Sequence, residues 1–130
     1  MKTLEPGLRG TASCTVTPDQ TAVAYGSGSV PVYATPAMVA LMERASVAAL
    51  SEALPAHQTS VGVRLEVSHL AATPPGETVR AEAVVTAVDG RKITFTIEAF
   101  DSTERIGEAV HERAIVSRDR FLERVQAKRR

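Results

Sequence analysis

Three polar residues are of types that could carry chemistry, although none of them is specific alone: Thr35, Glu43 and His69. Glu43 stands in a long run of small and apolar residues, and its helical neighbours at three and four positions are valine, alanine and serine. Burial disfavours a charged carboxylate, so we expect a raised pKa, which suits a general base. A glutamate paired with an arginine from another strand is an equally good interpretation.

His69 and Thr35 each have a structural alternative. His69 ends an apolar strand face, where a lone histidine is more often a hydrogen-bonded core residue than a catalyst. Thr35 precedes Pro36, and threonine at the N-cap followed by proline at the first helical position is typical of a helix start. The other two histidines, His57 and His111, lie in a loop and among charged residues, so we expect both at the solvent or on the sheet surface.

The sequence shows no pattern for a metal or a bound cofactor. The three histidines have no paired spacing, there is no His-Glu-x-x-His, and the Gly26-Ser27-Gly28 stretch lacks the lysine of a phosphate-binding loop. The lone Cys14 stands in an alternating segment, which predicts a buried or half-buried strand residue rather than a nucleophile. We therefore expect no metal site and no cofactor.

The elements that must position these residues follow from periodicity. Residues 36–54 carry little charge and are rich in helix formers, which predicts one helix buried on most of its circumference. Val61, Val63, Leu65, Val67 and His69 alternate along a strand and are expected on one face. Turn signals stand at Thr73–Gly76 and Asp89-Gly90. The remaining predictions are strands at 11–17, 21–25, 79–87, 93–99 and 105–117, the last with a bulge, and a short helix at 118–128.

This order predicts an α+β protein of the hotdog type, an antiparallel sheet wrapped around one long central helix, as a single domain over residues 1–130. Exposed sheet edges favour a homodimer. Lysine and arginine number 15, as do aspartate and glutamate, which argues against nucleic acid as a partner. No apolar run is long enough to span a membrane and no leader pattern is present, so we expect a cytoplasmic protein.

Three blocks of the sequence resemble the fluoroacetyl-CoA thioesterase-like family. They are Thr35-Pro36-Ala37-Met38-Val39-Ala40-Leu41-Met42-Glu43, Val67-Ser68-His69-Leu70-Ala71-Ala72-Thr73-Pro74-Pro75-Gly76 and His111-Glu112-Arg113-Ala114. The resemblance implies a hotdog-fold dimer that hydrolyses a small acyl-CoA, with CoA as part of the substrate. It places the family's catalytic threonine, glutamate and histidine on Thr35, Glu43 and His69, and a glycine of the thioester site on Gly62.

The resemblance has one departure. Fluoroacetyl-specific members carry phenylalanines in the loop before the helix, whereas residues 26–31 read Gly-Ser-Gly-Ser-Val-Pro here, which implies a looser wall over the acyl pocket. Glu43 would be general base or nucleophile, His69 would orient or protonate, and Thr35 would hydrogen-bond or attack the thioester. A CoA hydratase and a non-catalytic acyl-CoA-binding module are the alternatives. Since Thr35 and Glu43 lie about 12 Å apart along a helix, we expect the active site at a dimer interface.

Overall fold

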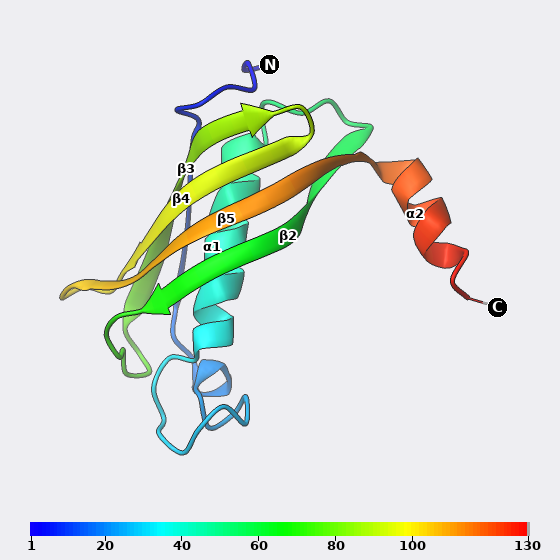
Figure 1. Cartoon of the computed structure of the whole chain (residues 1–130). Coiled ribbons are helices and arrows are strands. Elements are labelled where there is room, and N and C mark those ends of the chain that lie inside the picture. The colour runs from blue at the N-terminus through cyan, green and yellow to red at the C-terminus, as the bar shows by residue number, and fades with distance from the viewer. Residues whose placement is uncertain (130) are drawn as a thin grey trace.

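The computed structural model describes residues 1–129 and consists of one five-stranded antiparallel sheet curled on one long helix (Figure 1). This is the expected hotdog arrangement. The strands are β1 (Arg9–Thr15), β2 (Gln58–His69), β3 (Thr78–Asp89), β4 (Lys92–Phe100) and β5 (Arg105–Ser117); the helices are α1 (Thr35–Leu50) and α2 (Arg118–Gln126), with a short 3-10 turn η1 (Pro18–Gln20). In this part of the chain no helix is long and apolar enough to cross a membrane.

Helix α1 buries one face against the sheet and leaves the other open. Its buried side chains recur at helical spacing: Ala37, Met38, Leu41, Met42, Ala45, Ser46, Ala49 and Leu50. The opposite face is exposed, and Val47 keeps 49% of its surface accessible. The prediction of burial on most of the circumference is therefore wrong for the single chain, because the sheet covers one side only. The helix also ends at Leu50, with turns from Ser51 to Ala53.

The start of α1 differs from the expected cap. Ala34 is the N-cap residue and Thr35 is already helical, so the prediction of Thr35 as N-cap is wrong. The physical reason is that the Thr35 hydroxyl hydrogen-bonds to His69 across the fold instead of to its own helix. The 21–25 segment is likewise not a strand: it forms turns, and Thr21 makes one isolated bridge with Tyr33.

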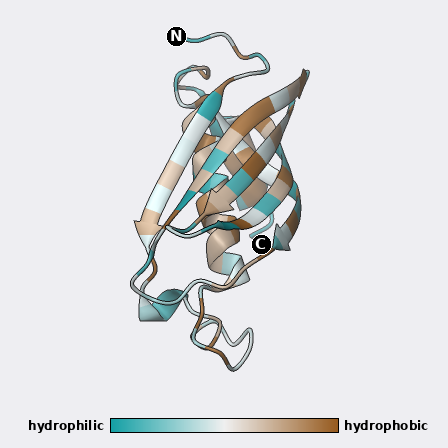
Figure 2. Ribbon diagram, turned by 90° about the vertical axis from the view of Figure 1, so that its left-hand side faces the viewer, coloured by the Kyte–Doolittle hydropathy of each residue, from teal (hydrophilic) through white to brown (hydrophobic). Residues whose placement is uncertain are grey.

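The sheet has the strand order β1-β3-β4-β5-β2, so β1 and β2 are its edges. Apolar and polar residues alternate along the strands (Figure 2). The inner positions of β4, namely Ile93, Phe95, Ile97 and Ala99, have no accessible surface, as predicted. Hairpin β3–β4 turns at Gly90, where φ is +60°.

Three β-bulges change which residues face the helix. In β2, Gly62 pairs with Arg113 and Arg64 pairs with Glu112, so Val63 is an extra residue. Beyond the bulge the alternation is reversed. The inner face of β2 therefore carries Ser60, Gly62, Leu65, Val67 and His69, and the prediction that Val61 and Val63 share the face of His69 is wrong.

The bulge in β3 at Thr86 likewise moves Ala87 off the face that carries Val79 to Val85. The expected bulge in β5 is present at Ile106: Ala99 pairs with Gly107, while Phe100 pairs with Arg105. Helix α2 projects from the end of β5, away from the sheet (Figure 1).

Candidate active site

Thr35 and His69 form a direct pair at the start of α1. The Thr35 Oγ1 lies 2.7 Å from the His69 Nδ1. The first turn of α1 carries the threonine and the last residue of β2 carries the histidine. The sequence therefore identified two residues, 34 positions apart, that the fold brings into contact.

His69 is held as a neutral, partly enclosed imidazole. Burial lowers its pKa below the ordinary value of 6.5. Its Nε2 is buried and has no hydrogen-bond partner among residues 1–129. The Tyr33 ring packs edge-on against the imidazole, with 6.5 Å between the two ring centroids. An unpaired buried nitrogen costs about 1–3 kcal/mol, so its presence beside a hydroxyl indicates a functional position.

The Ala-Thr-Pro-Pro-Gly block acts as a clamp that brings the two residues together. Thr73 is fully buried, and its hydroxyl donates to Asp101 at 2.9 Å. The Thr73 carbonyl accepts the Tyr33 N–H at 2.8 Å. Because Tyr33 stands two residues before Thr35, this contact ties the loop before α1 to the segment after β2. A cavity of about 370 Å³ lies beside the pair of Thr35 and His69. It is lined by Tyr33, Thr35, His69, Leu70, Ala71, Ala72 and part of the 22–32 loop.

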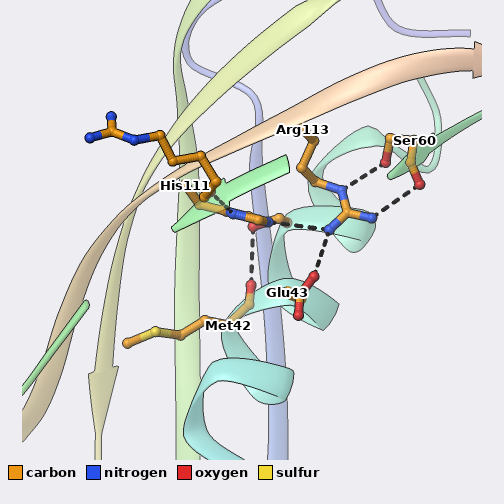
Figure 3. A network of polar contacts seen from close by, with 7 residues as sticks. Met42, Glu43, Ser60, His111 and Arg113 are labelled. Atoms are coloured by element: carbon orange, nitrogen blue, oxygen red, sulfur yellow. Dashed lines mark hydrogen bonds and ion pairs between the residues drawn. The ribbon is translucent and has the colours of Figure 1, made fainter. Parts of the chain in front are cut away.

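Glu43 belongs to a second polar cluster, farther along α1 (Figure 3). Its carboxylate lies 3.3 Å from the Nη1 of Arg113, which comes from β5. The Glu43 side chain is 42% exposed and that of Arg113 is 7% exposed. The interpretation of a glutamate paired with an arginine from another strand is thus confirmed, and the carboxylate is not the isolated, desolvated group that periodicity suggested.

His111 corrects the prediction of a surface residue, because it is 2% exposed and part of the same cluster. Its Nδ1 lies 2.8 Å from the carbonyl of Arg64, which can only accept, so the ring proton is on Nδ1. Its Nε2 then accepts from the Nη1 of Arg113 at 3.2 Å. Burial and the neighbouring guanidinium lower the pKa of His111 below 6.5, against the opposing effect of Glu43 and the Arg64 carbonyl.

Arg113 is fixed by four contacts. Besides Glu43 and His111, its Nε donates to the Ser60 hydroxyl at 2.8 Å and its Nη2 to the Ser60 carbonyl at 3.1 Å. These contacts fix the orientation of the guanidinium, and in this orientation its Nη1 binds the carboxylate of Glu43. Sequence reasoning assigned no role to Arg113, although the alternation of Ala109, His111, Arg113 and Ile115 could have placed both residues on the inner face of β5.

Gly62 lies directly against this cluster. A Cβ atom at this position would lie 2.8 Å from the Glu43 Oε2, 3.3 Å from the His111 Cε1 and 3.5 Å from the Arg113 Nη1. The missing side chain therefore leaves the space into which the carboxylate extends. His57, in contrast, is exposed as expected.

The single chain does not bring all candidate residues together. Thr35 and His69 form one pair, and Glu43 and Gly62 belong to the cluster of Arg113. Eight positions on a helix separate the two groups by about 12 Å. Within residues 1–129 no group of three histidine, cysteine, aspartate or glutamate side chains is arranged to hold a metal ion.

The fluoroacetyl-CoA-specific thioesterase family, FlK, matches residues 16–119. The chain belongs to this family. It is 40% identical over 97 residues to the fluoroacetyl-CoA thioesterase of Streptantibioticus cattleyicolor, covering 75% of this chain and 70% of that protein. The family match over residues 16–119 spans both polar groups, from Thr35 to Arg113.

Solved structures agree with this membership. A variant of the fluoroacetyl-CoA-specific thioesterase FlK, in complex with fluoroacetate and CoA, is 35% identical, with a TM-score of 0.83 over 91% of this chain and 99% of that chain. A Thermus thermophilus protein described as a thioesterase superfamily member is 26% identical, with a TM-score of 0.87 over 98% and 97% of the two chains. The hotdog fold is therefore shared with thioesterases.

Proposed function

We propose that this protein is a thioesterase that hydrolyses a small acyl-CoA to the free acid and CoA. Membership of the family makes it a thioester hydrolase of acyl-CoA. The observation that carries the assignment at the level of the site is the contact between Thr35 and His69, since it orients an exposed hydroxyl beside a cavity.

The steps of hydrolysis are carried out by two sets of residues: Glu43 with its cluster, and the pair of Thr35 and His69. The Glu43 carboxylate takes a proton from water as the water oxygen bonds to the acyl carbon. The Nδ1–H of His69 donates to the Thr35 hydroxyl oxygen, and the exposed Thr35 hydroxyl donates its own proton to the oxygen on which negative charge develops. His69 thereby orients the Thr35 hydroxyl. The carbon–sulfur bond then breaks, and the CoA thiolate takes the proton from Glu43.

Arg113 and Gly62 support Glu43 in this scheme. The guanidinium holds the carboxylate in place, and the absence of a side chain at Gly62 leaves room for it beside the edge strand. His111 fixes Arg113 in turn, because its Nε2 can accept from the guanidinium only while the ring is neutral.

The site is completed by a second copy of the chain. β2 is an exposed edge of 12 residues, and such an edge is satisfied by pairing. If two copies of β2 pair antiparallel about Glu66, inner residues lie opposite inner residues, with Leu65 opposite Val67, and His69 of one chain lies opposite the bulge at Gly62 and Val63 of the other. That pairing brings Thr35 and His69 of one protomer to Glu43 of its partner.

The activity is tested by incubating purified protein with acetyl-CoA and a thiol reagent. Thiol release at a rate that depends on Glu43 supports the proposal. Saturable binding of acetyl-CoA without thiol release would show the non-catalytic binding module instead.

The shared site is tested by mixing two inactive variants, Thr35→Ala and Glu43→Gln. In a mixed dimer with shared sites, one site carries both changes and the other carries neither. Free exchange of subunits then restores about a quarter of the wild-type rate, since half of the dimers are mixed and each has one intact site. If each chain holds its own complete site, mixing restores nothing.

A further inference from the structure

A groove lies between the second half of α1 and the beginning of β2. Its volume is about 240 Å³. One side is apolar and includes Val47, Leu50 and Leu54; the other is polar and includes Thr59 and Ser60. Arg118, the first residue of α2, also lines it. Val47, which is exposed on the open face of α1, forms part of this apolar side.

One end of the groove adjoins the cluster of Glu43. Ser60 lines the groove and also accepts two hydrogen bonds from Arg113, the residue that holds Glu43. Ser60 therefore links this end of the groove, through Arg113, to the carboxylate that we assign as the base.

The other end of the groove carries a positive charge. Gln58 pairs with Ser117, so Arg118 lies beyond the start of β2, on the far side from Gly62. The Arg118 side chain is exposed, and among residues 1–129 no carboxylate lies within 4.0 Å of its guanidinium. Its backbone N–H donates to the His57 carbonyl at 2.9 Å, which fixes the first turn of α2 at this point.

We propose that this groove holds the pantetheine arm of CoA and that Arg118 contacts a CoA phosphate at its far end. The inference rests on the proposed function and adds the residues that hold the substrate's handle. From Gly62 to Gln58 the strand advances about 13 Å. An extended pantetheine arm spans that distance, and its amides and dimethyl group match a wall that is polar on one side and apolar on the other.

A second basic cavity provides the control. This cavity has a volume of about 290 Å³. Its lining includes Arg91, Arg120 and Arg124, together with Phe121 and Glu123. It shares no lining residue with the groove. Because no shared residue links it to Glu43 or Ser60, we assign the phosphate to Arg118 rather than to Arg91.

The experiment uses three acetyl thioesters of decreasing length: acetyl-CoA, acetyl-pantetheine and S-acetyl-N-acetylcysteamine. Arg118→Ala should raise KM for acetyl-CoA about tenfold, with kcat unchanged and the other two substrates unaffected, because only CoA carries phosphates. Val47→Trp fills the groove and should raise KM for acetyl-CoA and acetyl-pantetheine, but little for the short substrate. Arg91→Ala is the matched control and should change none of them.

Three results would overturn the inference. One is a larger KM effect from Arg91→Ala than from Arg118→Ala. Another is an equal loss on all three substrates. The third is a change of oligomeric state in Val47→Trp by size-exclusion chromatography, which would show that a second copy covers the groove. If the wild-type protein hydrolyses none of the substrates, the proposed function fails, and calorimetry with free CoA and the same variants still tests the groove.

Discussion

Gly62→Ala should reduce activity strongly while leaving the fold intact. The new Cβ would lie 2.8 Å from the Glu43 Oε2, against an ordinary contact of 3.4 Å or more, so the carboxylate must retreat by about 0.6 Å. The contact between Glu43 and Arg113 is already 3.3 Å long and would be lost. Since a displacement of about 1 Å can cost on the order of 10² in rate, we expect kcat to fall roughly 10- to 100-fold.

Stability should change little in this variant. The clashing atom is the end of a flexible side chain that is 42% exposed, so it can move away. Replacing glycine also reduces the entropy of the unfolded chain, worth about 0.4–1 kcal/mol in favour of folding. The melting temperature should therefore stay within a few degrees of the wild type.

Gly10→Ala is the matched control, because the same chemical change meets backbone there. Its Cβ would lie 2.2 Å from the Ala49 nitrogen and 2.3 Å from the Ala45 oxygen, both in α1. Helix backbone cannot give way locally, so we expect a loss of about 1–3 kcal/mol or more in the free energy of unfolding. The measurements are thiol release from acetyl-CoA and thermal unfolding.

A double-mutant cycle tests whether Gly62→Ala acts through the carboxylate. In the Glu43→Gln background, Gly62→Ala should cause little further loss of rate, because the group that it displaces is already inactive. Two results would refute the reasoning: an unchanged kcat in Gly62→Ala, or losses that multiply in the double variant.

Three further predictions concern the same site. Glu43→Gln should lose on the order of 10²–10⁴ in kcat, whereas Thr35→Ser should retain much activity because the hydroxyl survives; small, equal losses would remove both residues from the mechanism. Burial lowers the pKa of His69 and His111 in the folded chain, so just below pH 6.5 the unfolded chain binds more protons than the folded one. The contribution of these two histidines to the free energy of unfolding should therefore be complete above pH 6.5. It should be lost as the pH falls through their pKa values in the folded state. His111→Gln should flatten this slope in urea unfolding, and an unchanged slope would contradict the assignment. The loop at 26–31 lacks aromatic side chains, so discrimination between fluoroacetyl-CoA and acetyl-CoA should be weak. The difference in activation free energy, obtained from the ratio of the two kcat/KM values, should stay within about 1–3 kcal/mol. A preference for fluoroacetyl-CoA well above that range would show that aromatic side chains in this loop are not needed for specificity.

Most of the fold was predictable because its signals are local. The alternation along β4, the turn glycine at Gly90 and the charge-poor run of α1 each depend on near neighbours in the sequence. The family blocks, likewise, are short and contiguous. The candidate residues Thr35, Glu43 and His69 lie in these blocks, and Gly62 lies seven residues before His69.

The bulge at Val63 limited the prediction for β2. One extra residue reverses the alternation, and nothing in the local pattern of Val61, Val63 and Leu65 marks where it occurs. Its position is set by pairing with β5, which is a long-range contact. For the same reason the inner face of β2 could not be assigned from periodicity alone.

The sequence by itself determined the order of the main elements, the hotdog class and the candidate residues Thr35, Glu43, His69 and Gly62. Only the tertiary structure decided their partners: Thr35 with His69, and Glu43 with Arg113 and the buried His111. The physical reason is that a hydrogen bond depends on distance and direction within a few tenths of an ångström, and those are fixed by strand register and bulges. Residues 34 or 70 positions apart carry no local signal of such a contact.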